Sequence, residues 1–127
     1  MSEPDFLRLE EVLYLHEQSL YLFGGLEGIG NHGLIESALA SAQNEYWYGK
    51  GDLFAISAAY AYHIAQAQAF TDGNKRTGVA SALVFLERNG IDVPVDDGSI
   101  YSALIAIAEK QMDKTGLATV LRKLCSH

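Results

Sequence analysis

Residues 68–77 read Gln-Ala-Phe-Thr-Asp-Gly-Asn-Lys-Arg-Thr, and this stretch joins two segments with helical apolar spacing. Asp72 is a carboxylate that suits a divalent metal ion, and Gly73 permits a sharp turn. The next three residues, Asn-Lys-Arg, open a helix whose first amides lack partners and attract anions. We interpret the combination as a site for magnesium and a nucleotide phosphate. The stretch contains no histidine, cysteine or serine placed to act as a base or nucleophile.

The two adjacent cations, Lys75 and Arg76, strengthen this interpretation, because the planar fork of an arginine matches phosphate oxygens. The alternative is an ordinary turn and helix cap with Lys75 and Arg76 in solvent. The stretch lacks the Gly-x-x-x-x-Gly-Lys-Ser/Thr pattern and is not a P-loop. Phe70 is expected to point into the core and to anchor the loop.

Apolar residues recur at helical spacing on both sides of this stretch. The run Gly78–Leu86 is apolar on all sides, which predicts a helix in the middle of a bundle. Alternation of period two is nearly absent, so the chain is expected to be a single all-α domain over residues 1–127. About six helices are predicted, within Phe6–Phe23, Gly33–Asn44, Leu53–Ala67, Asn74–Asn89, Ser99–Gln111 and Gly116–Leu124, with Asn31, Asp52 and Asn74 as the caps of the second, third and fourth.

Two connections are expected to be non-helical. Glu45–Gly51 is aromatic and then glycine-rich, which predicts a loop or short hairpin. Ile91–Val95 is too short for more than a connection or an edge strand.

The composition places the chain among soluble, one-domain proteins. It has 127 residues, 49% of them hydrophobic, and a net charge of −7. Nine cations against sixteen acids argue against a large basic patch and therefore against direct nucleic-acid binding. No apolar run reaches membrane-spanning length, and the acidic N-terminus has no apolar signal region. With a single cysteine, Cys125, the chain is expected in a reducing cytoplasm.

The chain has four histidines, which are the candidates for a catalytic base. His16 falls mid-helix, His32 lies beside a cap, and His127 is terminal. His63 precedes Gln68 by five residues, a rotation of about 500° on a helix, so it is not expected on the same face. None is predicted to be the base, and no spacing predicts a metal cluster.

The stretch resembles the motif of the Fic/Doc superfamily, and most closely that of the death-on-curing (Doc) toxins. The family pattern is His-x-Phe-x-Asp/Glu-Gly/Ala-Asn-Lys/Gly-Arg. The resemblance covers most of the chain, from about residue 7 to 122. The matching segments are Phe70 with Asp72–Arg76, Phe23–Gly25 with Gly28–Ile29, Leu34–Leu39, Asp52–Phe54 and Ala82–Gly90.

The resemblance implies a helical fold with a short flap and a role for each motif residue. Asp72 would bind magnesium, and Gly73, Asn74 and the helix amides would hold phosphate of ATP. Lys75 and Arg76 would clamp the transferring charge. The Glu45–Gly51 loop would form the flap that aligns the target peptide.

The residue at position 75 bears on the reaction. Fic relatives usually have glycine there and transfer a nucleotidyl group such as AMP to a hydroxyl. Lysine, as in Lys75, is typical of Doc, which moves the terminal phosphate of ATP onto a threonine of elongation factor Tu. The resemblance also implies a cognate antitoxin whose C-terminal helix packs against the toxin and blocks the site.

The chain departs from the family at Gln68, where the pattern has its catalytic histidine. Glutamine is neutral near pH 7 and cannot accept the proton of an attacking hydroxyl. Three hypotheses remain open: a slow Doc-type phosphotransferase, a module that binds nucleotide and antitoxin without chemistry, and a detoxified or engineered copy in which Gln68 replaces histidine.

Overall fold

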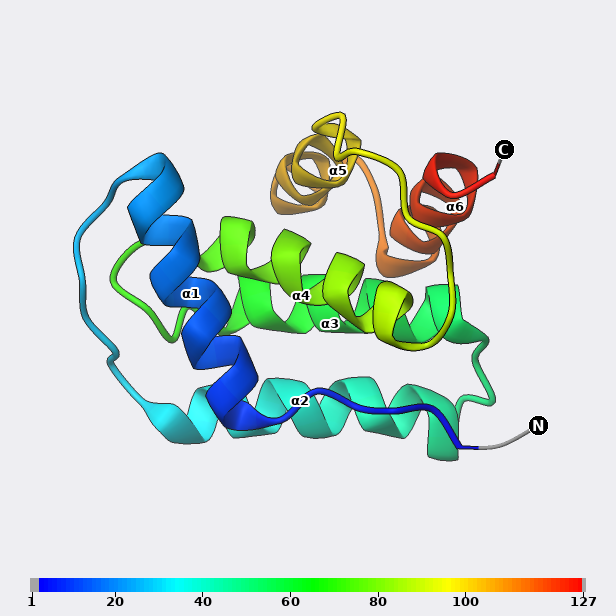
Figure 1. The fold of residues 1–127 in the computed structure, drawn as a ribbon, viewed down its shortest axis with the longest axis horizontal. Helices are drawn as coiled ribbons and strands as arrows, with labels where there is room; N and C mark the ends of the chain where they lie inside the picture. Colours follow the sequence, from blue (N-terminus) through cyan, green and yellow to red (C-terminus); the bar gives the residue numbers. More distant parts are fainter. Residues whose placement is uncertain (1–2, 127) are drawn as a thin grey trace.

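The computed structural model describes residues 3–126, so Met1, Ser2 and the terminal His127 lie outside the described range. Within that range the chain forms six α-helices, which confirms the predicted all-α fold (Figure 1). They are α1 (Leu9–Phe23), α2 (His32–Trp47), α3 (Leu53–Ala67), α4 (Asn74–Arg88), α5 (Ser99–Ala108) and α6 (Lys114–Leu124).

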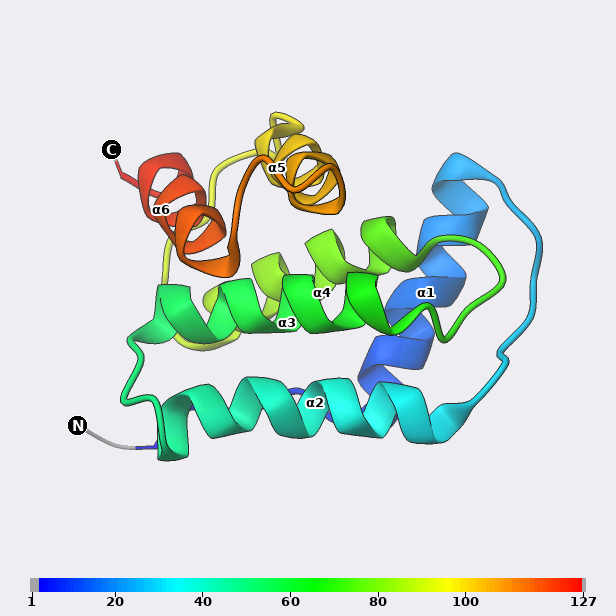
Figure 2. The same ribbon diagram turned by 180° about the vertical axis from the view of Figure 1, so that it is seen from behind.

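The helices α3 and α4 lie side by side at the centre of the molecule, as Figures 1 and 2 both show. α2 packs along α3, α1 crosses α4, and α5 and α6 cover the opposite side. A Cβ on Gly78 would lie 2.8 Å from the Ala61 carbonyl oxygen, so glycine lets the two central helices approach closely. The predicted burial of α4 is confirmed, since Val79, Ala82 and Phe85 are at most 4% exposed.

The predicted loop or hairpin at Glu45–Gly51 is wrong in its first half. α2 continues through Trp47, and only Tyr48–Lys50 and the residues after them leave the helix. Tyr46 and Trp47 both contact the ring of Phe6, so packing against the N-terminal segment overrides their preference for extended structure. No strand forms between residues 91 and 95, so this segment is a connection. Among the described residues, β-type pairing is limited to one isolated bridge.

The connections around α3 lie at opposite ends of that helix. The α2–α3 connection precedes Leu53, whereas the loop that follows α3 begins at Gln68, about 22 Å away along a fifteen-residue helix. The expectation that the Glu45–Gly51 segment is a flap over the site is therefore wrong. The α1–α2 connection, residues 24–31, lies beside the loop instead (Figures 1 and 2).

The far end of α4 is joined to the N-terminal segment by charge. Arg88 forms an ion pair with Glu11 and lies 4.0 Å from a carboxylate oxygen of Asp5. The bond to Arg88 lowers the pKa of Glu11 to about 2. Asn89 adds hydrogen bonds to the backbone of Asp5, one as donor and one as acceptor. These contacts hold the N-terminal segment against the C-terminal end of α4.

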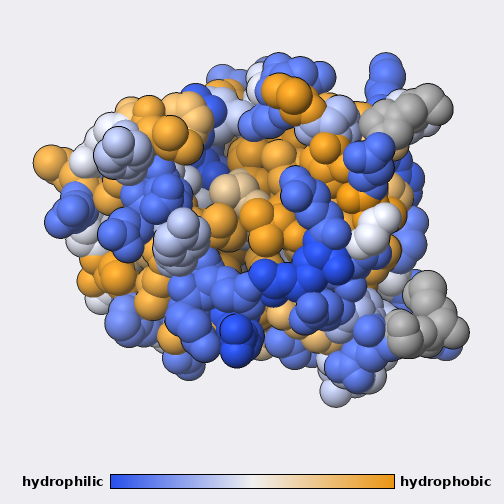
Figure 3. Space-filling model, in the orientation of Figure 1, coloured by the Kyte–Doolittle hydropathy of each residue, from blue (hydrophilic) through white to orange (hydrophobic). Residues whose placement is uncertain are grey.

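Figure 3 shows apolar surface gathered near the middle of one face, between polar margins. Leu83 and Val84 of α4 are only partly buried, and Ile105 of α5 is 38% exposed. No helix among residues 3–126 is both long enough and apolar enough to span a bilayer.

Candidate functional site

The site is built around a loop of residues 68–73 that joins α3 to α4, here called the site loop. Two backbone hydrogen bonds tie it to the α1–α2 connection. Gly30 N–H donates to the Ala69 carbonyl at 2.7 Å, and Thr71 N–H donates to the Gly28 carbonyl at 3.0 Å. The motif is therefore held by a segment some forty residues earlier in the chain.

His16 fixes the site loop from the side of α1. Its Nε2 donates to the backbone carbonyl of Asp72 at 2.8 Å, and its ring stacks on Phe70 with 3.7 Å between centroids. His16 is only 5% exposed and Phe70 only 4%, so the predicted burial of Phe70 is confirmed. This role of His16 was not predicted, because nothing local to His16 indicates a partner 56 positions away.

Asn74 performs a different task from the predicted helix cap. Gly73, at φ +83°, is the N-cap of α4, and no side chain caps the helix. The Asn74 amide is buried and bonds both backbone groups of Phe70, accepting from its N–H at 3.1 Å and donating to its carbonyl at 2.9 Å. The turn at Gly73 makes Asn74 the first helical residue, which directs its side chain back into the loop. The N-terminus of α4 consequently lacks a competing side-chain acceptor.

Gln68 ends α3 in a left-handed conformation, with φ +52° and ψ +38°. This region is sparsely populated by residues other than glycine, although histidine, asparagine and aspartate are enriched there. The side chain is exposed, and its Nε2 donates to the Ala65 carbonyl at 2.9 Å. Its Oε1 lies 3.5 Å from Nδ2 of Asn74, a long contact. The amide thus lies back over the end of α3.

The predicted site residues converge on one cavity of about 550 Å³. One oxygen of Asp72 accepts the Leu26 N–H at 2.8 Å. Arg76 is partly buried between two aromatic rings, which disfavours the simple surface alternative for that side chain. The lining residues are Phe23, Gly24, Gly25, Gln68, Thr71, Asp72, Gly73, Asn74, Lys75, Arg76 and Tyr101. A small anion with a bound cation matches the charges gathered here.

Comparison with known proteins identifies the family of this chain. A family model described as the Fic/DOC family matches residues 6–86, which include the whole site loop and most of α4. The chain belongs to the Fic/DOC family. Among its relatives, "Protein kinase doc" of Escherichia phage P1 is 34% identical over 116 residues, covering 91% of each chain. "Toxin Doc" of Mycolicibacterium smegmatis is 36% identical over 77 residues, covering 58% of each.

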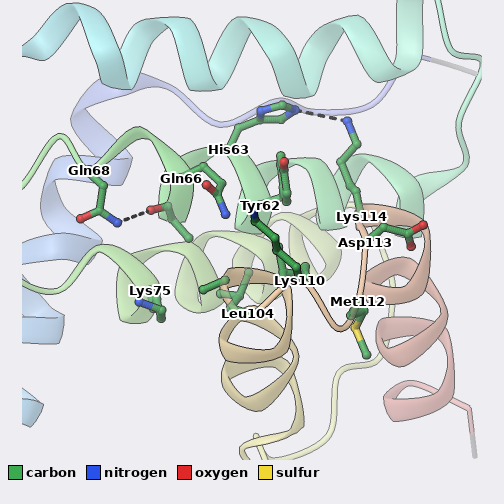
Figure 4. Close-up of a pocket in the computed structure, with 13 residues that line it drawn as sticks. Tyr62, His63, Gln66, Gln68, Lys75, Leu104, Lys110, Met112, Asp113 and Lys114 are labelled. Atoms are coloured by element: carbon green, nitrogen blue, oxygen red, sulfur yellow. Dashed lines mark hydrogen bonds between the residues drawn. The ribbon is translucent and has the colours of Figure 1, made fainter.

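A second, larger groove opens from the Fic/DOC site between α3, α5 and the start of α6 (Figure 4). Its volume is about 850 Å³, and it shares Gln68 and Lys75 with the first cavity. Lys75, Lys110 and Lys114 line it together with Asp113 and apolar side chains such as Leu104, and Lys114 also pairs with Glu45 at 3.6 Å. The groove therefore combines apolar surface with charged groups, most of them lysines, and runs into the motif.

His63 also lines this groove, on α3 upstream of Gln68, and among the described residues no hydrogen bond joins the two side chains. The Nε2 of His63 lies 3.3 Å from Nζ of Lys114, and burial together with that ammonium lowers the pKa of His63. Among the described residues, no group of three or more His, Cys, Asp or Glu side chains could hold a metal ion alone.

Proposed function

We propose that this Fic/DOC protein is a Doc-like toxin of a toxin–antitoxin pair, which transfers the terminal phosphate of ATP to a hydroxyl of elongation factor Tu. One observation carries the proposal. The cavity at the uncapped N-terminus of α4 gathers Lys75, Arg76 and a single carboxylate, Asp72. The phage P1 relative bears the name of a protein kinase, which favours phosphoryl transfer over transfer of AMP.

The chain's own groups fit a nucleotide phosphate. The first amides of α4 carry partial positive charge, and Lys75 and the fork of Arg76 add two full charges. The side chain of Asn74 is occupied by Phe70, so we assign its backbone N–H to the phosphate, beside that of Gly73. These groups neutralise charge on the phosphoryl oxygens, and positioning with charge accounts for most of the catalysis of such transfers.

Asp72 fits a magnesium ion for a related reason. One of its oxygens is held by Leu26, and the other accepts no hydrogen bond from the described residues. Magnesium favours one carboxylate together with phosphate oxygens and waters, which is the donor set that Asp72 and ATP supply. When bound, the ion would neutralise phosphate charge. Asp72 without it would repel the substrate.

The transfer forms a bond from the acceptor oxygen to the terminal phosphorus, while the bond from that phosphorus to the bridging oxygen of ADP breaks. The acceptor hydroxyl must also lose its proton. Gln68 cannot take it, because a neutral amide is not a base at pH 7. A positioned base contributes about 10²–10⁴-fold to such steps, so we expect slow transfer with the proton passing to water.

A second candidate function follows from the position of the Gln68 amide. Its Nε2 is engaged by the Ala65 carbonyl and the amide is not a base, which favours a module that binds nucleotide and antitoxin without chemistry. Transfer of AMP, the Fic-type reaction, is the third alternative. Lys75 disfavours it, because the ammonium occupies part of the phosphate site that glycine leaves open.

For the antitoxin we propose the groove of Figure 4 as the binding surface. An amphipathic helix with acidic residues would match its lysines and its apolar floor. A segment lying there would reach Gln68 and Lys75 and would close the site. We place the protein in the cytoplasm, where ATP and elongation factor Tu are found.

The direct test is Gln68→His, assayed with purified elongation factor Tu and magnesium ATP. We expect phosphate transfer to rise about 10²–10⁴-fold, since the variant restores a base. The left-handed backbone at this position also accommodates histidine readily. Label on the terminal phosphate reports phosphoryl transfer, whereas label on the α-phosphate reports transfer of AMP.

Gln66→His is the matched control, because Gln66 is exposed and lines the same groove two residues upstream. It should leave transfer at the level of the unaltered chain. If Gln68→His folds normally and transfers neither label, a missing base does not explain low activity and the binding module is favoured.

A further inference from the structure

Arg76 differs from the other arginines of the chain in its partners. Arg8, Arg88 and Arg122 each form an ion pair with a glutamate or aspartate. Arg76 has no carboxylate partner within residues 3–126, although acidic residues outnumber basic ones sixteen to nine in this protein. An unpaired guanidinium at a partly buried position of an acidic protein calls for another explanation.

Two aromatic rings take the place of a carboxylate. The guanidinium carbon lies 3.9 Å from the ring centroid of Tyr101 and 4.2 Å from that of Phe23. The rings come from different helices, Phe23 from the last residue of α1 and Tyr101 from the first turn of α5. Three elements that are distant in sequence therefore meet at one side chain.

This packing restricts how Arg76 can bind a ligand. Aromatic faces attract a guanidinium through its flat face, and they leave its N–H groups unsatisfied because these point outward in the plane. The N–H groups of Arg76 donate to no acceptor among the described residues, and Arg76 lines the site cavity with both rings. Its edge is free for acceptor oxygens.

We propose that Phe23 and Tyr101 are positioning residues that hold the Arg76 guanidinium between them and present its edge to anionic oxygens in the cavity. The inference rests on the proposed function and deepens it. An ordered arginine loses less conformational freedom on binding, and an immobilised side chain of this kind corresponds to about a two- to tenfold change in affinity.

The α1–α2 connection links this aromatic pair to the carboxylate of the same site. Phe23 is followed directly by Gly24 and Gly25, and a Cβ on Gly25 would lie 3.1 Å from Cβ of Asp72. Gly25 at φ +123° therefore lets the chain pass close to Asp72 immediately after the ring that covers Arg76. This short segment therefore sets the distance between Phe23 and Asp72.

The first arm of the test uses the protein without nucleotide. The NMR signal of the Arg76 Nε–H group should carry a ring-current shift from Tyr101 and Phe23. Tyr101→Leu should move this signal toward that of a solvated arginine, whereas Tyr101→Phe, which keeps the ring, should leave it nearly unchanged. Ile105→Ala, on the same helix and 38% exposed, is the control substitution.

The second arm measures magnesium ATP binding by calorimetry. Tyr101→Leu should weaken binding about two- to tenfold, and Tyr101→Phe should restore it. In an Arg76→Ala background Tyr101→Leu should add no further loss, because the ring acts through the arginine. A merely structural effect of Tyr101 would persist in that background.

The outcomes separate the two proposals. If the Arg76 signal does not move in Tyr101→Leu, or if the loss of affinity persists without Arg76, the positioning role is overturned and Tyr101 contacts the nucleotide itself or only supports the fold. If the signal moves as expected but the unaltered protein binds no magnesium ATP, the nucleotide function fails while the orientation of Arg76 stands.

Discussion

The two ends of α4 each carry an arginine, and the two are used in opposite ways. Arg88, in the last turn, pairs with Glu11 and fastens the N-terminal segment to the helix. Arg76, in the first turn, lies between two rings, and its N–H groups find no acceptor among residues 3–126. One helix thus has a charge paired within the fold at its far end and a charge without a carboxylate partner in the described part of the chain at its site end.

The difference follows from what surrounds each end. A carboxylate beside Arg76 would neutralise it and would repel an anionic ligand, whereas aromatic rings orient the guanidinium and leave its charge in place. At the far end the carboxylates of Glu11 and Asp5 neutralise the guanidinium, so that charge stabilises the fold. Substitutions at the far end should therefore change stability alone, whereas those at the site end should change nucleotide binding, with or without a change in stability.

The largest expected effect on stability lies at the site end, at His16. His16→Ala removes a buried ring from Phe70 and leaves the Asp72 carbonyl unpaired, so we expect a loss of about 3 kcal/mol in the free energy of unfolding. Magnesium ATP affinity should fall as well, because the site loop loses its lateral support. Urea denaturation and calorimetry measure the two effects.

His16→Phe separates the two contacts of His16, because it keeps the stacking on Phe70 and loses only the hydrogen bond. It should cost about 1–2 kcal/mol and should still loosen the loop around Asp72. Unchanged nucleotide affinity in both variants would mean that His16 supports the core alone and that the site end does not depend on it.

A smaller effect is expected from Arg88→Ala at the far end, about 0.5–1 kcal/mol of stability near pH 7, because solvent screens an exposed ion pair. The folded-state pKa of Glu11, about 2, is below its ordinary value of 4.5. Its contribution is therefore fully present above about pH 4.5 and is lost as the pH falls toward 2. Arg88→Ala should remove this part of the acid dependence, as denaturation curves between pH 2 and 6 would reveal.

If the two ends of α4 differ in this way, Arg88→Ala should leave magnesium ATP affinity unchanged. A change in affinity comparable with that of a site variant would break the distinction between the two ends of α4.

The sequence predicted the helices well because helical periodicity is local, and the apolar run Gly78–Leu86 correctly indicated a buried α4. The motif also predicted which residues would share one cavity, since Gln68 and Asp72–Arg76 are neighbours in the chain. The prediction of which distant segment lies beside the site was wrong. The segment that borders the site is the α1–α2 connection rather than Glu45–Gly51, because helix direction decides which connections meet.

Side-chain partners distant in sequence were also beyond prediction. Nothing near Tyr101 indicates that its ring covers Arg76, and no local pattern pairs His16 with Asp72. The prediction that Asn74 caps a helix was wrong for a different reason. Asparagine is a common helix cap, yet here the turn at Gly73 gives that position to glycine and directs the amide to Phe70.

Calorimetric titration of magnesium ATP into the unaltered protein, Arg76→Ala and Arg88→Ala tests the assignment of Arg76 to the phosphate most directly. We expect saturable binding to the unaltered protein and to Arg88→Ala. For Arg76→Ala we expect affinity lower by about one to two orders of magnitude, because charge-assisted hydrogen bonds are lost. Absence of binding by the unaltered protein, or equal affinity in the Arg76→Ala variant, would contradict this assignment.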